Sequence, residues 1–125
     1  MNDEHFAKLI EQSLEDIPSE FKEKVENVSI IIEDWPSREQ ILRLRKEGIY
    51  GTLYGLYQGI PHTKRNHYGI GGPLPDKITI YKYPILQSSR TDEDVKNIVR
   101  ETVVHEIGHH FGLSDAEIYK AMRGD

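Results

Sequence analysis

Cysteine is absent from this chain of 125 residues. Its absence excludes disulfide bonds and any metal site built from thiolate ligands, and it fits the reducing cytoplasm, where we expect the protein to reside. Long apolar runs are also missing, so no stretch approaches the roughly 20 residues that a membrane-spanning helix requires. The first five residues include acids where a secretory signal would carry bases. We therefore predict a cytoplasmic protein with no membrane partner.

An excess of positive charge is missing as well, because 16 basic residues stand against 21 acidic ones and the formal net charge is -5 at pH 7. This balance argues against nucleic acid as a partner. The length predicts a single domain over residues 1–125, with one core and no room for a two-lobed cleft. We therefore expect a monomer that binds its substrate along a shallow surface.

What the chain does contain is a dense group of metal-binding residue types between positions 105 and 115. His105 and His109 are four residues apart, a spacing that places both imidazoles on one face of a helix, where they can bind one ion. A catalytic zinc site usually takes three protein ligands and keeps its fourth position for water. Asp115 can supply the third ligand, because Gly112 can adopt a left-handed conformation, end the helix and turn the chain back.

Glu106 follows the first histidine directly, so it would lie close to the open coordination position and act as a general base without being a ligand. A chance His-Glu-x-x-His would arise roughly once in thirty chains of this composition, and requiring Gly112 lowers the frequency to about one in four hundred. One alternative keeps the motif without the metal. In it, His105 and His109 are hydrogen-bonded core histidines with Glu106 as their partner.

The motif ends a predicted amphipathic helix, which begins after Thr91 as N-cap and stops at Gly112. The acids at positions 92–94 complement the positive end of its dipole. Its expected buried arc consists of Val95, Ile98, Val99, Thr102 and Val103. His105, Glu106 and His109 project over part of the same arc. We expect these groups to point towards the core, where burial is costly unless they are paired or bind a metal.

Asp115 has a structural alternative to ligation. Residues 114–117 resemble a capping box with Ser114 as N-cap, which would make Asp115 an exposed first-turn acid of a C-terminal helix. Both roles are compatible if that helix begins facing the metal. His110 is out of register with the other two histidines, which favours packing, or orientation of a ligand, over ligation.

The remainder of the chain predicts two further helices and two strands. Apolar residues recur at helical spacing from residue 6 to 17, which predicts an N-terminal helix that ends or kinks near Pro18. Residues 28–33 form a β-branched run, typical of a strand buried on both faces in the middle of a small sheet. Residues 37–47 predict a charged helix stopped by Gly48, and residues 77–83 predict another strand.

The pattern His-Glu-x-x-His-x-x-Gly-x-x-Asp resembles the motif of the zincin metallopeptidases, and most closely that of the small bacterial minimal-zincin domains. The resemblance extends to residues 55–61, 74–81 and 102–104, so nearly the whole chain is covered. It implies a compact α+β fold, with a small mixed β-sheet packed against an N-terminal helix and the active-site helix. It also implies Zn²⁺ held by His105, His109 and Asp115, with Glu106 as the catalytic base and acid.

The region from 48 to 75, rich in glycine, proline and tyrosine, predicts strands and long loops. In zincins an edge strand typically pairs with an extended peptide above the active-site helix, so this region is the expected substrate-binding rim. Four polar residues within it could stabilise an oxyanion or could simply form a polar surface loop. They are His62, Lys64, Arg65 and His67.

The expected function is zinc-dependent hydrolysis of peptide bonds in a peptide or protein substrate. Two alternatives stay open. A bacterial ribosomal-RNA endoribonuclease family uses three histidines at the spacing of His105, His109 and Asp115, although it lacks a catalytic carboxylate at the position of Glu106. The other alternative is a zinc-binding regulatory module that is catalytically silent.

Overall fold

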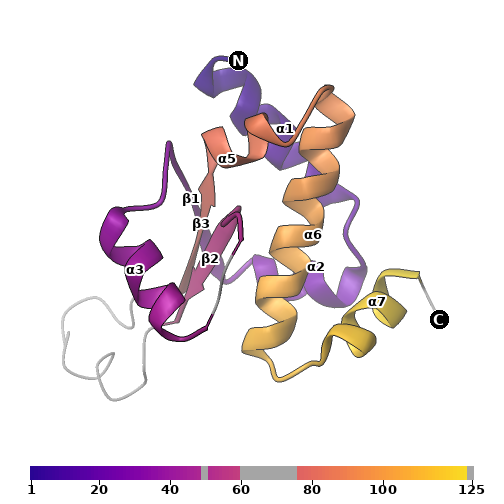
Figure 1. Cartoon of the computed structure of the whole chain (residues 1–125). Helices are drawn as coiled ribbons and strands as arrows, with labels where there is room; N and C mark the ends of the chain where they lie inside the picture. Colours follow the sequence, from indigo (N-terminus) through magenta and orange to yellow (C-terminus); the bar gives the residue numbers. More distant parts are fainter. Residues whose placement is uncertain (49–50, 60–75, 124–125) are drawn as a thin grey trace, which may run out of the picture.

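The computed structural model describes residues 1–48, 51–59 and 76–123 of the chain (Figure 1). Its elements follow the order α1 (Asp3–Glu15), α2 (Ser19–Val25), β1 (Val28–Glu33), α3 (Arg38–Lys46), β2 (Gly55–Gln58), β3 (Asp76–Tyr81), α5 (Lys82–Gln87), α6 (Asp92–His110) and α7 (Asp115–Arg123). Helices and a small sheet therefore share the described chain, which confirms the expected α+β class. None of the described helices combines the length and apolar character needed to cross a membrane.

The three strands form one mixed sheet in the order β1-β3-β2. β1 runs parallel to β3, with Val28 opposite Asp76, and β2 runs antiparallel to β3, with Tyr57 opposite Ile78. Four consecutive residues at the end of β3, from Ile78 to Tyr81, are buried. The central strand is therefore β3, and β2 occupies one edge of the sheet.

The prediction that residues 28–33 form the central strand is wrong. Along β1, half-buried residues alternate with exposed ones, and Ile31 leaves 37% of its surface exposed. A β-branched run reports that a segment favours an extended backbone. It does not report which other strands will pair with that segment, and here only β3 pairs with β1 among the described residues.

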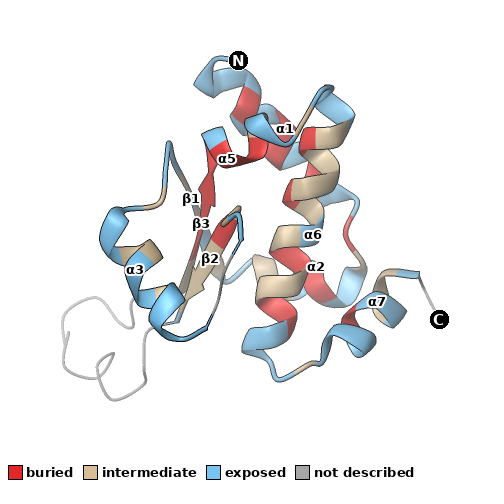
Figure 2. Cartoon of the chain, in the orientation of Figure 1, coloured by how far each residue is buried: buried red, intermediate tan, exposed pale blue. Residues whose placement is uncertain are grey.

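α6 is the helix around which the other elements pack. It contacts α1, α2, α5 and α7 on its helical sides and β2 and β3 of the sheet. Buried residues gather where these elements meet (Figure 2). The core cluster consists of Phe6, Leu9, Ile10, Ile17, Phe21, Ile78, Ile80, Ile85, Val95, Val99, Val103, Val104, Ile107 and Ile118. Because α6 contributes its valine stripe to this core, the position of the histidine motif at its end is fixed by the whole fold.

Two helix predictions hold and one strand prediction needs correction. α1 ends at Glu15, before Pro18, and α3 begins after Ser37, whose side chain forms a capping box with Gln40. The strand predicted over residues 77–83 ends earlier, because Lys82 already starts α5. Pro84 is the third residue of this helix, in the first turn, where a missing N–H costs no helical hydrogen bond.

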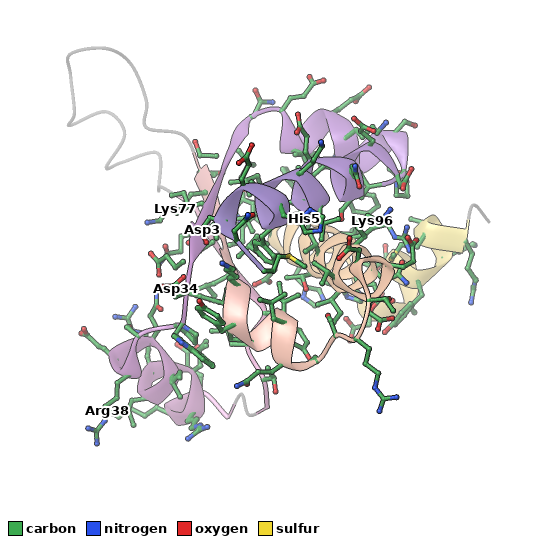
Figure 3. The ribbon with its side chains drawn as sticks, turned by 90° about the horizontal axis from the view of Figure 1, so that it is seen from above. Asp3, His5, Asp34, Arg38, Lys77 and Lys96 are labelled. Atoms are coloured by element: carbon green, nitrogen blue, oxygen red, sulfur yellow. The ribbon has the colours of Figure 1, made fainter. Side chains whose placement is uncertain are left out.

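An ion pair and a hydrogen bond hold the start of α1 against the starts of α5 and α6. Asp3 Oδ1 lies 2.6 Å from Lys82 Nζ, and Asp92 Oδ2 lies 2.9 Å from His5 Nε2. Asp3 and His5 both lie on the side of α1 that faces these helices (Figure 3). The Lys82 side chain is only 4% exposed, so its charge depends on Asp3 for a partner.

Candidate metal centre

α6 places His105 and His109 one turn apart near its C-terminal end. The helix starts at a capping box in which Thr91 Oγ1 accepts from the Asp94 N–H and the Asp94 carboxylate accepts from the Thr91 N–H. The helix is regular to His110, so the two imidazoles share one side, with ring centroids 5.9 Å apart. The spacing in the sequence thus gives the pair of rings that the motif predicts.

The chain reverses immediately after the second histidine. Gly112 has φ +82°, in the left-handed region that favours glycine. The Leu113 N–H donates to Gly108 O at 2.9 Å, and the Gly112 N–H donates to His109 O at 3.0 Å. This pair of bonds is the Schellman arrangement that satisfies the last carbonyls of a helix. Leu113 then packs against the core, which directs the following residues back towards the histidines.

α7 begins where this reversal ends. The Ser114 side chain accepts from the Glu117 N–H at 3.2 Å, and Glu117 Oε1 accepts from the Ser114 N–H at 3.2 Å. This is the capping box that the sequence suggests, and Asp115 is the first residue of the helix. Asp115 Oδ1 nevertheless lies 2.7 Å from His109 Nε2 and 3.7 Å from His105 Nδ1. Asp115 is therefore a first-turn acid of α7 that also lies beside both histidines.

Gly108 allows α7 to approach α6 this closely. A Cβ at this position would lie 2.6 Å from both Cγ1 and Cδ1 of Ile118, a fully buried residue of α7. The absence of a side chain at Gly108 therefore sets how near the start of α7 comes to the two histidines. This contact joins the glycine inside the motif to the position of Asp115.

His105, His109 and Asp115 could together hold a metal ion. One ligand atom from each lies within 4.8 Å of the other two. Ligand atoms around a tetrahedral zinc stand roughly 3 to 3.5 Å apart, given metal–ligand distances of about 2.0 to 2.2 Å. Two imidazole nitrogens and a carboxylate oxygen also form a donor set that catalytic zinc sites use. The donor chemistry therefore fits zinc, and a separation of up to 4.8 Å requires the three side chains to move only slightly closer around an ion.

The burial expected for this group is only partly found. The His105 side chain is 23% exposed, that of His109 49%, and that of Asp115 69%. His109 lies in the last turn of α6, beyond Val104, the last of the buried valines, so helical periodicity alone overestimates how deep this histidine lies. The candidate metal centre therefore lies open at the surface.

Glu106 faces β2 and is half-buried. Its Oε1 accepts a hydrogen bond from the Tyr57 backbone N–H at 3.3 Å. Burial raises the pKa of the Glu106 carboxyl, while the bond from Tyr57 and the charge of His109 act in the opposite direction. A glutamate with a raised pKa beside a candidate metal site is suited to take up and release a proton.

Three aromatic side chains surround the motif. The His110 ring stacks on Tyr57 with centroids 4.1 Å apart, and it lies outside the group that could hold a metal. This agrees with the packing role expected for His110. The Tyr119 ring meets His105 edge to face at 5.1 Å.

The contact of the Tyr57 backbone N–H with Glu106 was not predicted from the sequence. Tyr57 stood out only as one of several tyrosines in the 48–75 region, and no local pattern indicates which backbone amide will meet Glu106. His62, Lys64, Arg65 and His67, the four polar residues considered for the substrate rim, lie outside the described residues.

Comparisons with known proteins agree with the motif and the fold. A solved structure of a conserved hypothetical protein from Thermus thermophilus is 27% identical, with a TM-score of 0.53, and the match covers 88% of this chain and 94% of that one. No curated protein matches the chain. The family model described as "Zincin-like metallopeptidase" matches residues 25–124, which include every residue of the candidate metal centre. On this evidence, the chain belongs to the zincin-like metallopeptidase family.

Proposed function

We propose that this protein is a zinc-dependent hydrolase that cleaves peptide bonds, with zinc held by His105, His109 and Asp115 and with Glu106 as general base and acid. The observation that carries the proposal is the convergence of Asp115, from a second helix, on the two histidines of α6. An exposed first-turn acid has no structural need to contact two histidines. A shared cation explains why all three side chains point to one place.

The residues of the chain divide the reaction between them. A bound zinc ion would supply Lewis acidity, which polarises a carbonyl group and lets water lose a proton near neutral pH. Hydrolysis of an amide requires water to give up one proton and the departing amine to gain one. Glu106 can do both, because the Tyr57 amide holds Oε1 and leaves Oε2 to carry the proton.

The edge strand β2 supports a peptide as the substrate class. In the register of the sheet, Tyr81 N–H donates to Tyr54 O, so the backbone groups of Gly55 and Tyr57 point away from β3. Tyr57 N–H accordingly reaches Glu106. An extended peptide that paired with Gly55 on this side of β2 would lie beside the base and would be recognised through its backbone, with little regard to its sequence.

The test compares wild type, Glu106→Gln and a matched control, Glu101→Gln, which removes an exposed carboxylate from the same helix. Each protein is loaded with zinc, assayed by elemental analysis, and incubated with casein, a mixed peptide library and structured RNA, with and without a chelator. We expect wild type and the control to cleave casein or peptides. Glu106→Gln should keep its zinc and lose activity by a factor on the order of 10² to 10⁴.

Three outcomes would contradict the proposal in different ways. Cleavage by Glu106→Gln at the native rate would remove the base assignment. Chelator-sensitive cleavage of RNA alone would indicate a nuclease. A protein that holds stoichiometric zinc and cleaves nothing in the library would be a silent binding module.

A further inference from the structure

Tyr57 connects the general base to the rest of the fold through both its backbone and its side chain. Its N–H donates to Glu106 Oε1 at 3.3 Å. Its hydroxyl donates to Asp76 Oδ2 at 2.6 Å, and its ring stacks on His110 at 4.1 Å with an angle of 23° between the planes. The side chain is therefore held by the first residue of β3 and the last residue of α6.

These contacts form one assembly. His110 Nε2 lies 3.8 Å from the same Asp76 oxygen that receives the Tyr57 hydroxyl. A Cβ on Gly59 would lie 2.9 Å from His110 Cε1, so the chain leaving β2 passes directly against the ring. Tyr57 thus sits between β3, the end of α6 and the chain beyond β2, and none of these elements can shift without moving it.

The bond from Tyr57 to Glu106 is sensitive to such shifts. At 3.3 Å it is at the long end for an N–H···O hydrogen bond, which usually spans about 2.7 to 3.2 Å. A backbone amide has no rotamers with which to follow its acceptor, so its direction is set only by the position of its strand. β2 has only four residues, and the contacts of the Tyr57 side chain with Asp76 and His110 attach it to β3 and α6.

We infer that Tyr57 is a positioning residue for Glu106. Its side chain, fixed by Asp76 and His110, holds β2 at the distance from α6 at which the amide of residue 57 binds and aims the Glu106 carboxylate. The inference rests on the proposed function for the role of Glu106 as base. The contact itself exists without a substrate or a metal, so it can be tested separately.

The first test is nuclear magnetic resonance of the zinc-free, ¹⁵N-labelled protein, followed at the amide of residue 57. Glu106→Gln removes the charged acceptor and should move this amide proton upfield. Tyr57→Phe and Asp76→Ala leave Glu106 in place and remove the bond that holds the Tyr57 hydroxyl, so they should move the same proton in the same direction. The matched control is Tyr54→Phe, which removes a tyrosine hydroxyl bonded to Ser88 at 2.8 Å, away from Glu106. If the amide proton of residue 57 shifts no further in Tyr57→Phe and Asp76→Ala than in this control, the inference is overturned.

The second test separates positioning from general stability by kinetics. Tyr57→Phe should lower kcat by about tenfold and leave KM and zinc content near the wild-type values, while the control Tyr54→Phe stays active. In a Glu106→Asp background, where the shorter acid no longer reaches the amide, the same substitution should have little further effect. If Tyr57→Phe lowered kcat by the same factor in the Glu106→Asp background as in wild type, the inference would be overturned. An inactive wild type would instead count against the proposed function, and the resonance test would still decide the role of Tyr57.

Discussion

The Asp115 carboxylate lies 2.7 Å from His109 Nε2, although the two residues belong to different helices. The contact depends on a helix that ends at His110, on a left-handed Gly112 and on a capping box at Ser114. Each of these features serves helix termination by itself. Together they bring a carboxylate to a pair of imidazoles, and the predictions below follow from that arrangement and from its neighbour, the contact between Glu106 and β2.

Asp115→Ala should abolish stoichiometric zinc binding, and Ser114→Ala should not. Groups that only orient a metal ligand already contribute about 10- to 100-fold to affinity, so loss of a ligand should exceed about 100-fold. In the zinc-free protein, Asp115→Ala should cost only about 0.3 to 1 kcal/mol, as for a first-turn acid. Ser114→Ala removes the cap and should cost about 0.5 to 2 kcal/mol. Zinc titration and urea unfolding measure both effects, and zinc retention in Asp115→Ala would reduce Asp115 to a helix-terminal acid.

Gly108→Ala should weaken zinc binding although residue 108 has no side chain and is not a candidate ligand. The added Cβ would meet Ile118 at 2.6 Å and push α7, and Asp115 with it, away from α6. Overpacking costs about 1 to 3 kcal/mol, and the better helix propensity of alanine offsets roughly 0.8 to 1 kcal/mol of it. We expect lower stability by urea unfolding and a lower zinc affinity by titration.

A compensating change provides the control for Gly108→Ala. Ile118→Ala alone leaves a cavity and should cost about 2 to 5 kcal/mol. The double variant should be less destabilised than the sum of the two, because the new methyl group enters the space that Ile118 leaves. Strict additivity would show that the two side chains do not compete for the same volume.

Glu106→Gln should change the pH dependence of stability in the zinc-free protein. Burial raises the pKa of Glu106 above its ordinary value of 4.5. Between that value and the raised one, the native state binds more protons than the unfolded state, so ionising Glu106 lowers stability as the pH rises through this window. The variant has no such loss, and its stability relative to wild type should increase with pH over the same window.

Urea unfolding at a series of pH values measures this difference. Glu101→Gln, on the exposed side of the same helix, corrects for the removal of one negative charge from α6. A difference between Glu106→Gln and wild type that stays constant from acidic to neutral pH would show that burial does not raise the pKa of this carboxyl.

Gly55→Ala should separate β2 from α6 and slow the reaction. A Cβ at this position would lie 2.7 Å from Thr102 Cγ2 and 3.0 Å from Thr79 O. The first contact can be relieved by Thr102→Ser, which removes the methyl group, but the second involves the backbone of β3. We expect a stability loss of about 1 to 3 kcal/mol by urea unfolding and a lower kcat with unchanged zinc content. Partial recovery of kcat in the Gly55→Ala, Thr102→Ser double variant would locate the clash, and full activity in Gly55→Ala would refute it.

Much of the candidate site could be predicted from local patterns. Four-residue spacing pairs His105 with His109, and the glycine at 112 indicates where the helix ends. Both features depend on residues close together in the sequence, whose geometry the helix itself fixes. The valine stripe of α6 was also predictable, since a 3.6-residue period identifies a buried face. This prediction fails in the last turn of the helix. There the same period predicts a buried His109, whereas the side chain is 49% exposed.

The assignments that needed distant residues could not be made in the same way. The β-branched run at 28–33 predicts a strand, yet its place at the edge depends on β3, more than 40 residues later in the chain. The shorter strand before α5 depends on a helix that begins at Lys82, with Pro84 in its first turn, rather than on any lack of strand propensity at residues 82 and 83. Tyr57 offers no pattern at all, because its role comes from the backbone amide that every non-proline residue carries.

The sequence by itself determined the chemistry of this protein: the metal-binding residue types, their order, the left-handed glycine and the acid beside the first histidine. Those choices are local, and a helix converts them into geometry without help from the rest of the chain. Tertiary structure alone decided that Asp115 reaches His109 from the first turn of α7, that the site lies open at the surface, and that β2 presents Tyr57 to Glu106. These distances depend on how closely α7 and β2 pack against α6. Glycine at positions 108 and 55 permits this close packing, because a Cβ at either position would clash with a neighbouring element.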